Sequence, residues 1–148
     1  MFIGHEPILR FLNSAQQEKR LAQVYCFAGP GQVGKRTLAK IMAAQLLGVD
    51  FARLENHSDY TYVERLENEK TGKLNKDLSI GQARALREKL TQRSWSGGYK
   101  VVIENEADAF KEESPSALLK TLEEPALNTF IILVTDNDAA LLPTIRSR

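Results

Sequence analysis

The apolar residues of this chain recur with helical spacing in three stretches. From Glu6 to about Lys19, successive apolar residues are one, three and three positions apart, which predicts an amphipathic helix. Thr37–Leu47 has a similar stripe, with Gly48 as its expected C-terminal stop. A third helix is expected from Ser79, which forms a capping box pattern with Gln82, to about Arg93. The predicted buried stripes are Ile8, Leu9, Leu12 and Ala15; Leu38, Ile41, Met42 and Leu46; and Ile80, Ala83, Leu86 and Leu90.

Between these stripes lie short continuous apolar runs, the pattern of parallel strands that are buried on both faces. The runs are Ala22–Ala28, Tyr60–Val63, Lys100–Ile103 and Thr129–Thr135. The first is expected to be a buried strand that enters a loop, and the second is followed by a polar, exposed excursion over Glu67–Lys76. One more helix is expected to start at Pro115, to bury Leu118, Leu119 and Leu122, and to end before Pro125. Alternating strands and helices predict a three-layer α/β fold with a mainly parallel sheet.

Composition limits what the domain does. The 148 residues suffice for one compact domain, and 20 Lys and Arg against 19 Asp and Glu exclude a global basic field for nucleic acids. The single cysteine, Cys26, excludes an internal disulfide and a cysteine-based zinc cluster, and it suits a reducing compartment. The N-terminus does not resemble a signal peptide and no run is long enough to span a membrane, so we expect a cytoplasmic protein.

A phosphate-binding loop is predicted directly after the first strand. Gly29–Lys35 fits the spacing G-x-x-x-x-G-K, and a helix follows at once. In such a loop, backbone N–H groups surround phosphate oxygens, the helix dipole favours anions, and the lysine reaches the terminal phosphates. The candidate nucleotide-binding residues are Gly29, Pro30, Gly31, Gln32, Val33, Gly34, Lys35, Arg36 and Thr37.

Two positions depart from a hydrolysing site. Arg36 stands where a serine or threonine should hold Mg²⁺, and Asn105 stands where an aspartate should position the metal. Glu106 keeps the place of the acid that orients the attacking water. These changes predict ATP binding that is weak or independent of Mg²⁺, no protein metal site, and little hydrolysis. The alternative is that Thr37 and Glu104 replace the missing ligands in an active ATPase.

Four segments carry a resemblance to a known family: Leu21–Pro30, Gly98–Ile103, Ser116–Pro125 and Leu142–Arg148. They resemble bacterial clamp-loader subunits of DNA polymerase III, the delta-prime type first and the gamma/tau type second. The resemblance implies an AAA+ (RecA-like) P-loop domain over residues 1–148. This sequence lacks the zinc module of many members, so we expect no zinc. We also expect this chain to be without the lid and collar domains that follow in the family.

The resemblance also implies partners and roles. It implies other clamp-loader subunits of delta and gamma/tau types, the sliding clamp, and primer-template DNA reached through the assembly. By the same resemblance, Arg148 is the arginine finger that enters a neighbouring ATP site, and Thr135 matches the position that senses the γ-phosphate. The resemblance and the changes at Arg36 and Asn105 together predict a stator subunit that does not hydrolyse ATP. The alternative is an active motor subunit of gamma/tau type. A nucleic-acid-binding module is disfavoured by the near-neutral charge and scattered aromatic residues.

Overall fold

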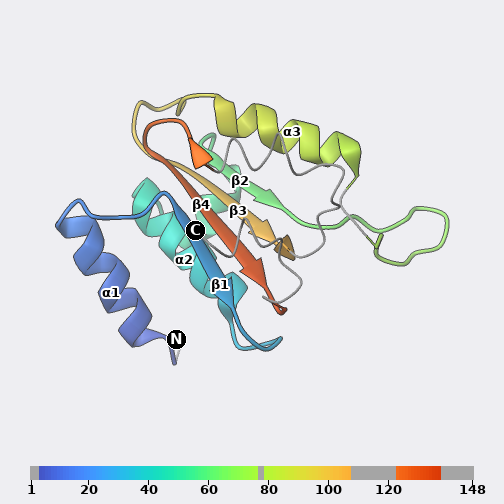
Figure 1. The fold of residues 1–148 in the computed structure, drawn as a ribbon, viewed down its shortest axis with the longest axis horizontal. Coiled ribbons are helices and arrows are strands. Elements are labelled where there is room, and N and C mark those ends of the chain that lie inside the picture. Colours follow the sequence, from blue (N-terminus) through green and yellow to red (C-terminus); the bar gives the residue numbers. More distant parts are fainter. Residues whose placement is uncertain (1–3, 77–78, 108–122, 138–148) are drawn as a thin grey trace.

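Within the part of the chain that the structure describes, the fold is built on a sheet of four parallel strands. The computed structural model describes residues 4–76, 79–107 and 123–137. The strands run in the order β1-β4-β3-β2 (Figure 1). The elements are α1 (Glu6–Gln17), β1 (Val24–Ala28), α2 (Lys35–Leu47), the 3-10 helix η1 (Phe51–Asn56), β2 (Tyr60–Val63), α3 (Ile80–Thr91), β3 (Lys100–Asn105) and β4 (Thr129–Thr135).

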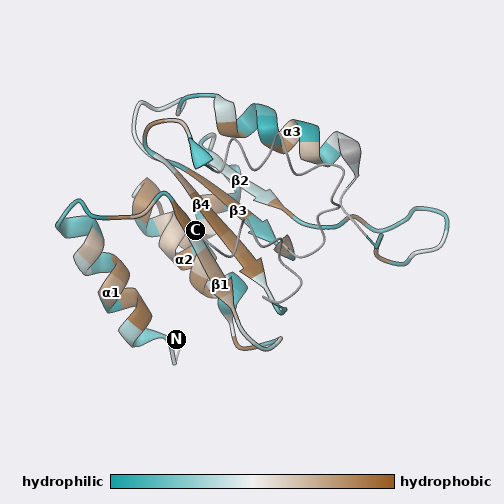
Figure 2. Ribbon diagram, in the orientation of Figure 1, coloured by the Kyte–Doolittle hydropathy of each residue, from teal (hydrophilic) through white to brown (hydrophobic). Residues whose placement is uncertain are grey.

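Helices cover both faces of this sheet. Along β3, Ile103 packs in one buried cluster with Met42 of α2, whereas Val102 packs in a second cluster with Leu86 and Leu90 of α3. This alternation follows from the two-residue period of a strand, which sends successive side chains to opposite faces. Figure 1 shows α2 and α3 on opposite sides of the sheet, and Figure 2 shows the apolar character of β3 and β4. The predicted three-layer α/β fold is confirmed.

Several element ends coincide with sequence signals. Strands β2 and β4 have the predicted bounds. The capping box of α3 is present, because the Gln82 N–H donates to Ser79 Oγ and the Ser79 N–H donates to Gln82 Oε1, both over 3.1 Å. Gly48 ends α2 in the left-handed region, with φ of 67°. Helix α2 begins at Lys35, two residues earlier than predicted, directly after the left-handed Gly34.

Two predictions about burial are wrong. Helix α1 ends at Gln17 and buries Leu12 and Ala15, but Ile8 is 41% exposed because only the later part of this helix reaches the core. Strand β1 is half-buried rather than buried, and its Cys26 is exposed. The reason is topological, since β1 lies at an edge of the described sheet and pairs only with β4 there.

The polar excursion after β2 forms an exposed hairpin, which we call the β2–α3 hairpin (residues 66–75). Glu67 pairs with Leu74 in an antiparallel bridge, and the segment projects away from the sheet (Figure 1). The helix predicted from Pro115, with Leu118, Leu119 and Leu122, lies outside the described residues. Within the ranges that the structure describes, no helix combines the length and apolar character needed to cross a membrane.

Candidate nucleotide-binding site

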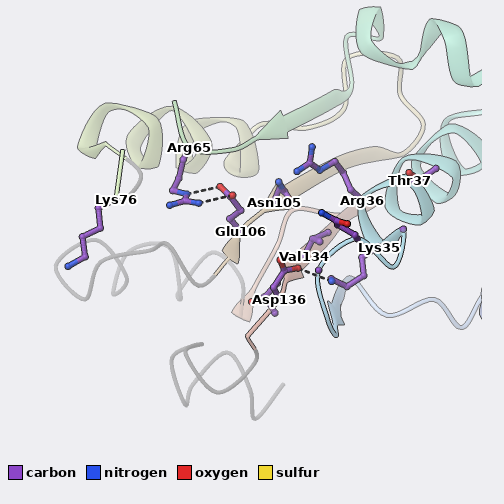
Figure 3. Close-up of a pocket in the computed structure, with 13 residues that line it drawn as sticks. Lys35, Arg36, Thr37, Arg65, Lys76, Asn105, Glu106, Val134 and Asp136 are labelled. Atoms are coloured by element: carbon purple, nitrogen blue, oxygen red, sulfur yellow. Dashed lines mark hydrogen bonds and ion pairs between the residues drawn. The ribbon is translucent and has the colours of Figure 1, made fainter. Parts of the chain in front are cut away.

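A cavity of about 790 Å³ opens at the carboxyl ends of β3 and β4, beside the first turn of α2 (Figure 3). The carboxyl ends of parallel strands lie at the same edge of a sheet, which is where α/β folds bind ligands. The cavity is lined by Gly31, Gln32, Gly34, Lys35, Arg36, Thr37, Arg65, Lys76, Asn105, Glu106, Val134, Thr135 and Asp136.

The loop between β1 and α2 has the backbone of a phosphate cradle. Gly34 precedes α2 with φ of 88°, and Gln32 also has a positive φ, of 63°. At Gly31, an added Cβ would lie 3.2 Å from Asp136 Oδ2, so a larger residue would crowd that carboxylate. The first N–H groups of a helix have no partner within the helix and favour anions. The loop and the start of α2 therefore fit a phosphate group.

Lys35 is buried against its own loop. Its Nζ donates to the carbonyl oxygens of Gly29, over 2.7 Å, and Pro30, over 2.5 Å. It also lies 2.8 Å from Asp136 Oδ1, whose side chain is 69% exposed (Figure 3). An ammonium group has three donors, and these contacts use all of them. A phosphate that enters the cavity has to replace at least one of these contacts to bind Lys35 directly.

The place where a P-loop enzyme holds Mg²⁺ has the wrong donors here. Arg36 is a cation that cannot ligate a metal, and the buried Asn105 amide donates to Glu64 Oε2 over 3.4 Å. Glu104 is buried one residue earlier in β3, so its side chain points to the opposite face from Asn105. Across the described residues, no three His, Cys, Asp or Glu side chains form a possible metal site. The residues fit a phosphate and do not fit Mg²⁺.

Glu106 is held in an ion pair. Arg65 donates from Nε to Glu106 Oε2 and from Nη2 to Glu106 Oε1, both over 2.8 Å (Figure 3). The hydrogen bonds from Arg65 lower the pKa of the Glu106 carboxyl, although partial burial acts in the opposite direction. A carboxylate bound in this way has both oxygens engaged, so it is poorly placed to accept a proton from a water molecule.

Other predicted residues have varied positions. Thr135 lines the cavity but is buried, and its Oγ1 accepts a hydrogen bond from the Asn137 N–H over 3.1 Å. The carbonyl oxygen of Val33 lies 2.6 Å from Nε2 of His5 and faces the start of α1 instead. Arg148 lies outside the described residues, so its role stays a prediction.

The structure adds three charged residues that the sequence analysis missed: Arg65, Lys76 and Asp136. Arg65 lies two residues beyond the Tyr60–Val63 run, and Asp136 directly follows the Thr129–Thr135 run. The carboxyl ends of the strands in a parallel sheet lie at one edge. That rule would have found both. Nothing in the sequence signals Lys76, because the β2–α3 hairpin separates it from β2.

Comparison with known proteins places the chain. The family described as "DNA polymerase III, delta subunit" matches residues 4–148. The chain belongs to this family. The subunit delta' of DNA polymerase III from Pseudomonas aeruginosa is 35% identical over 141 residues, which are 86% of this chain and 41% of that protein. The corresponding subunit from Bacillus subtilis is 30% identical over 151 residues, covering 95% of this chain and 44% of its own length.

Solved structures agree on the fold of this delta-prime-type chain. A gamma subunit-related protein of DNA polymerase III from Thermotoga maritima has a TM-score of 0.66 at 20% identity, covering 93% of this chain and 43% of its own. The RuvB Holliday junction branch migration motor from the same organism has a TM-score of 0.62 at 21% identity, covering 99% and 43%. The chain thus spans less than half the length of these relatives.

Proposed function

We propose that this chain is the AAA+ domain of a clamp-loader subunit in bacterial DNA replication, and that its own site does not turn over ATP. One observation carries the second part: both positions that hold Mg²⁺ in P-loop enzymes are replaced, by Arg36 and Asn105, in an otherwise well-formed cavity. The engagement of Glu106 by Arg65 supports it further, because the acid that should orient water is already bound.

In this proposal the chain contributes to catalysis through a neighbouring subunit. Arg148 enters the ATP site of that neighbour and stabilises the negative charge that develops on the γ-phosphate during transfer. The motif around Arg148, Leu142–Arg148, supports the assignment through its resemblance to the family. Such an arginine accelerates hydrolysis by about 10³- to 10⁵-fold in related systems.

The proposed partners follow from the family. We infer that the chain assembles with other clamp-loader subunits of delta and gamma/tau types in the cytoplasm, and that sliding clamp and primer-template DNA are reached through this assembly. ATP would bind weakly through Lys35 and the start of α2, with Thr135 near the terminal phosphate. A bound nucleotide would then serve assembly rather than energy conversion.

Restoring the metal ligands tests whether the site is catalytically degenerate. Arg36→Thr combined with Asn105→Asp supplies a hydroxyl and a carboxylate at the two altered positions. With ATP present, we expect Mn²⁺ bound to the restored protein to give an electron paramagnetic resonance spectrum distinct from free Mn²⁺–ATP. The unaltered protein should give the spectrum of free Mn²⁺–ATP alone.

The alternative function, an active motor subunit of gamma/tau type, predicts the opposite. A motor whose Thr37 and Glu104 hold the metal should already bind Mn²⁺ with ATP, and the double substitution should change its spectrum little. Glu104 faces away from the cavity in β3, which favours the stator.

A further inference from the structure

The cavity contains more positive than negative side chains. Its cations are Lys35, Arg36, Arg65 and Lys76, and its anions are Glu106 and Asp136. The two carboxylates are already engaged, since Asp136 pairs with Lys35 over 2.8 Å and Glu106 pairs with Arg65 over 2.8 Å. In the part of the chain that the structure describes, Arg36 and Lys76 form no ion pair. Among the described residues that line it, the cavity therefore has two positive charges in excess.

Arg36 stands on the side of the cavity where Mg²⁺ sits in P-loop enzymes. It directly follows Lys35 at the start of α2, and its side chain extends toward Asn105 at the end of β3 (Figure 3). It is also near enough to Glu106 to help lower the pKa of that carboxyl, although the hydrogen bonds from Arg65 dominate. A guanidinium group thus extends from one altered metal position, Arg36, toward the other, Asn105.

Lys76 reaches the same cavity from a different element. It follows the β2–α3 hairpin, whose first residue comes directly after Arg65. Arg65 Nη1 also donates to the carbonyl oxygen of Asn75 over 3.3 Å, which ties the two ends of the hairpin together beside the cavity. The hairpin base therefore adds a second cation to the lining of the cavity.

We propose that this cavity binds a polyphosphate chain as the metal-free anion, with Arg36 in place of Mg²⁺ as the main counter-charge and Lys76 as a second one. The inference rests on the proposed lack of hydrolysis at this site and names the ligand. Guanidinium groups pair with phosphate oxygens through two parallel N–H donors, so one arginine can neutralise charge on adjacent phosphates.

Mg²⁺ should weaken this binding rather than strengthen it. In the Mg²⁺ complex of ATP the metal cancels two of the phosphate charges that attract Arg36 and Lys76. The metal would also enter a site whose two carboxylates, Glu106 and Asp136, are already paired with cations, and the neighbouring guanidinium of Arg36 would repel it. A conventional P-loop site would show the reverse dependence.

Isothermal titration calorimetry of the full-length protein tests the inference. The titrants are ATP with EDTA, ATP with excess Mg²⁺, and inorganic tripolyphosphate with EDTA. We expect ATP with EDTA to bind at least as tightly as ATP with Mg²⁺. Comparable affinity for tripolyphosphate would support the phosphate chain alone as ligand, and tighter ATP binding would support a nucleotide; both agree with the inference.

Two substitutions assign the binding to the named residues. Arg36→Ala should weaken metal-free binding by about 10- to 100-fold, as expected for loss of hydrogen bonds to a charged group. Lys76→Ala should weaken it by roughly two- to fivefold, because an exposed ion pair contributes less. The matched control is Arg87→Ala, an exposed arginine of α3 outside the cavity, which should not change the affinity.

Three results would overturn the inference: no binding of either ligand, tighter binding with Mg²⁺, or equal affinities for the Arg36→Ala and Arg87→Ala proteins. Failure to bind would leave the proposed role of Arg148 intact, because that role concerns a neighbour's site. Conversely, a clamp loader indifferent to Arg148 would contradict the proposed function without affecting the calorimetry.

Discussion

At the scale of single residues, Arg65 determines the state of Glu106. The guanidinium contacts both carboxylate oxygens over 2.8 Å, and both side chains are partly shielded from water. Bidentate pairs of this kind are stronger and more specific in geometry than single contacts. Glu106 also has a positive φ, of 60°, which is uncommon for a residue with a side chain. The ion pair therefore keeps both carboxylate oxygens of Glu106 engaged at the edge of the cavity.

Removing the guanidinium should release this acid. In Arg65→Ala, the pKa of Glu106 should rise toward its ordinary range, because the main cause of its depression is lost. The depressed pKa stabilises the fold above the unfolded-state pKa of about 4.3, and this contribution is lost as pH falls through the folded-state pKa. We expect Arg65→Ala to lower the free energy of unfolding by about 1 kcal/mol at neutral pH, a value already reduced because both side chains are partly exposed.

The carboxyl ¹³C resonance of Glu106, followed by NMR from pH 2 to pH 7, measures this change. Arg65→Lys keeps the charge without the two parallel donors, so its Glu106 pKa should lie between those of the wild type and Arg65→Ala. An unchanged titration curve in Arg65→Ala would contradict the account of this ion pair.

At the scale of elements, Asp59 joins two segments that are distant in the chain. It lies just before β2, is buried, and accepts hydrogen bonds from the N–H groups of Trp95 and Ser96 and from the Ser96 hydroxyl. Burial raises the pKa of Asp59, but the hydrogen bonds from Ser96 and Trp95 outweigh it and hold the pKa below its usual range. The loop that leads into β3 is therefore attached to the start of β2.

Asp59→Asn should destabilise the protein by about 1–3 kcal/mol at pH 7, because an amide nitrogen cannot accept the hydrogen bonds left by a carboxylate oxygen. The contribution of Asp59 is present above its unfolded-state pKa of about 3.9 and is lost as pH falls through the lower folded-state pKa. Urea unfolding at pH 7 and pH 3 should thus show a smaller difference between the two proteins at pH 3. An equal difference at both pH values would contradict this role for the charge.

Elements with a strong local signal were predicted well from the sequence. The capping box of Ser79 and Gln82 located the start of α3, and the uninterrupted apolar run of Thr129–Thr135 gave the exact bounds of β4. The half-buried state of β1 could not be predicted, because its apolar run resembles that of a central strand and only the strand order shows that it lies at an edge. Local patterns define elements, whereas burial depends on their neighbours.

The same division applies to the site. The spacing of Gly29–Lys35 predicted a phosphate-binding loop, and part of this segment lines one cavity together with Asn105 and Glu106 from the end of β3. The sequence could not predict that Arg65 binds Glu106, since 41 residues separate them and only the parallel pairing of β2 and β3 brings them together. A motif shows which groups are present, and the fold shows which of them are already engaged.

At the scale of the whole molecule, one cavity contains a loop that fits phosphate and two residues, Arg36 and Asn105, that do not fit Mg²⁺. The chain belongs to the family described as "DNA polymerase III, delta subunit", and the proposal gives it a catalytic role only at a neighbour's site. The excess positive charge of the cavity and the engagement of Glu106 both agree with a site that binds without hydrolysis. In this account the chain contributes to ATP hydrolysis only through Arg148, at the site of a neighbouring subunit.

The most direct test is ATP turnover by the assembled clamp loader that contains the full-length protein with Arg148→Ala, in the presence of clamp and primed DNA. We predict that hydrolysis at the adjoining site falls by about 10³-fold or more. The control is Arg146→Ala, which removes the same charge two residues earlier and should leave turnover unchanged. Equal turnover with Arg148→Ala and Arg146→Ala would contradict the proposed role of this subunit.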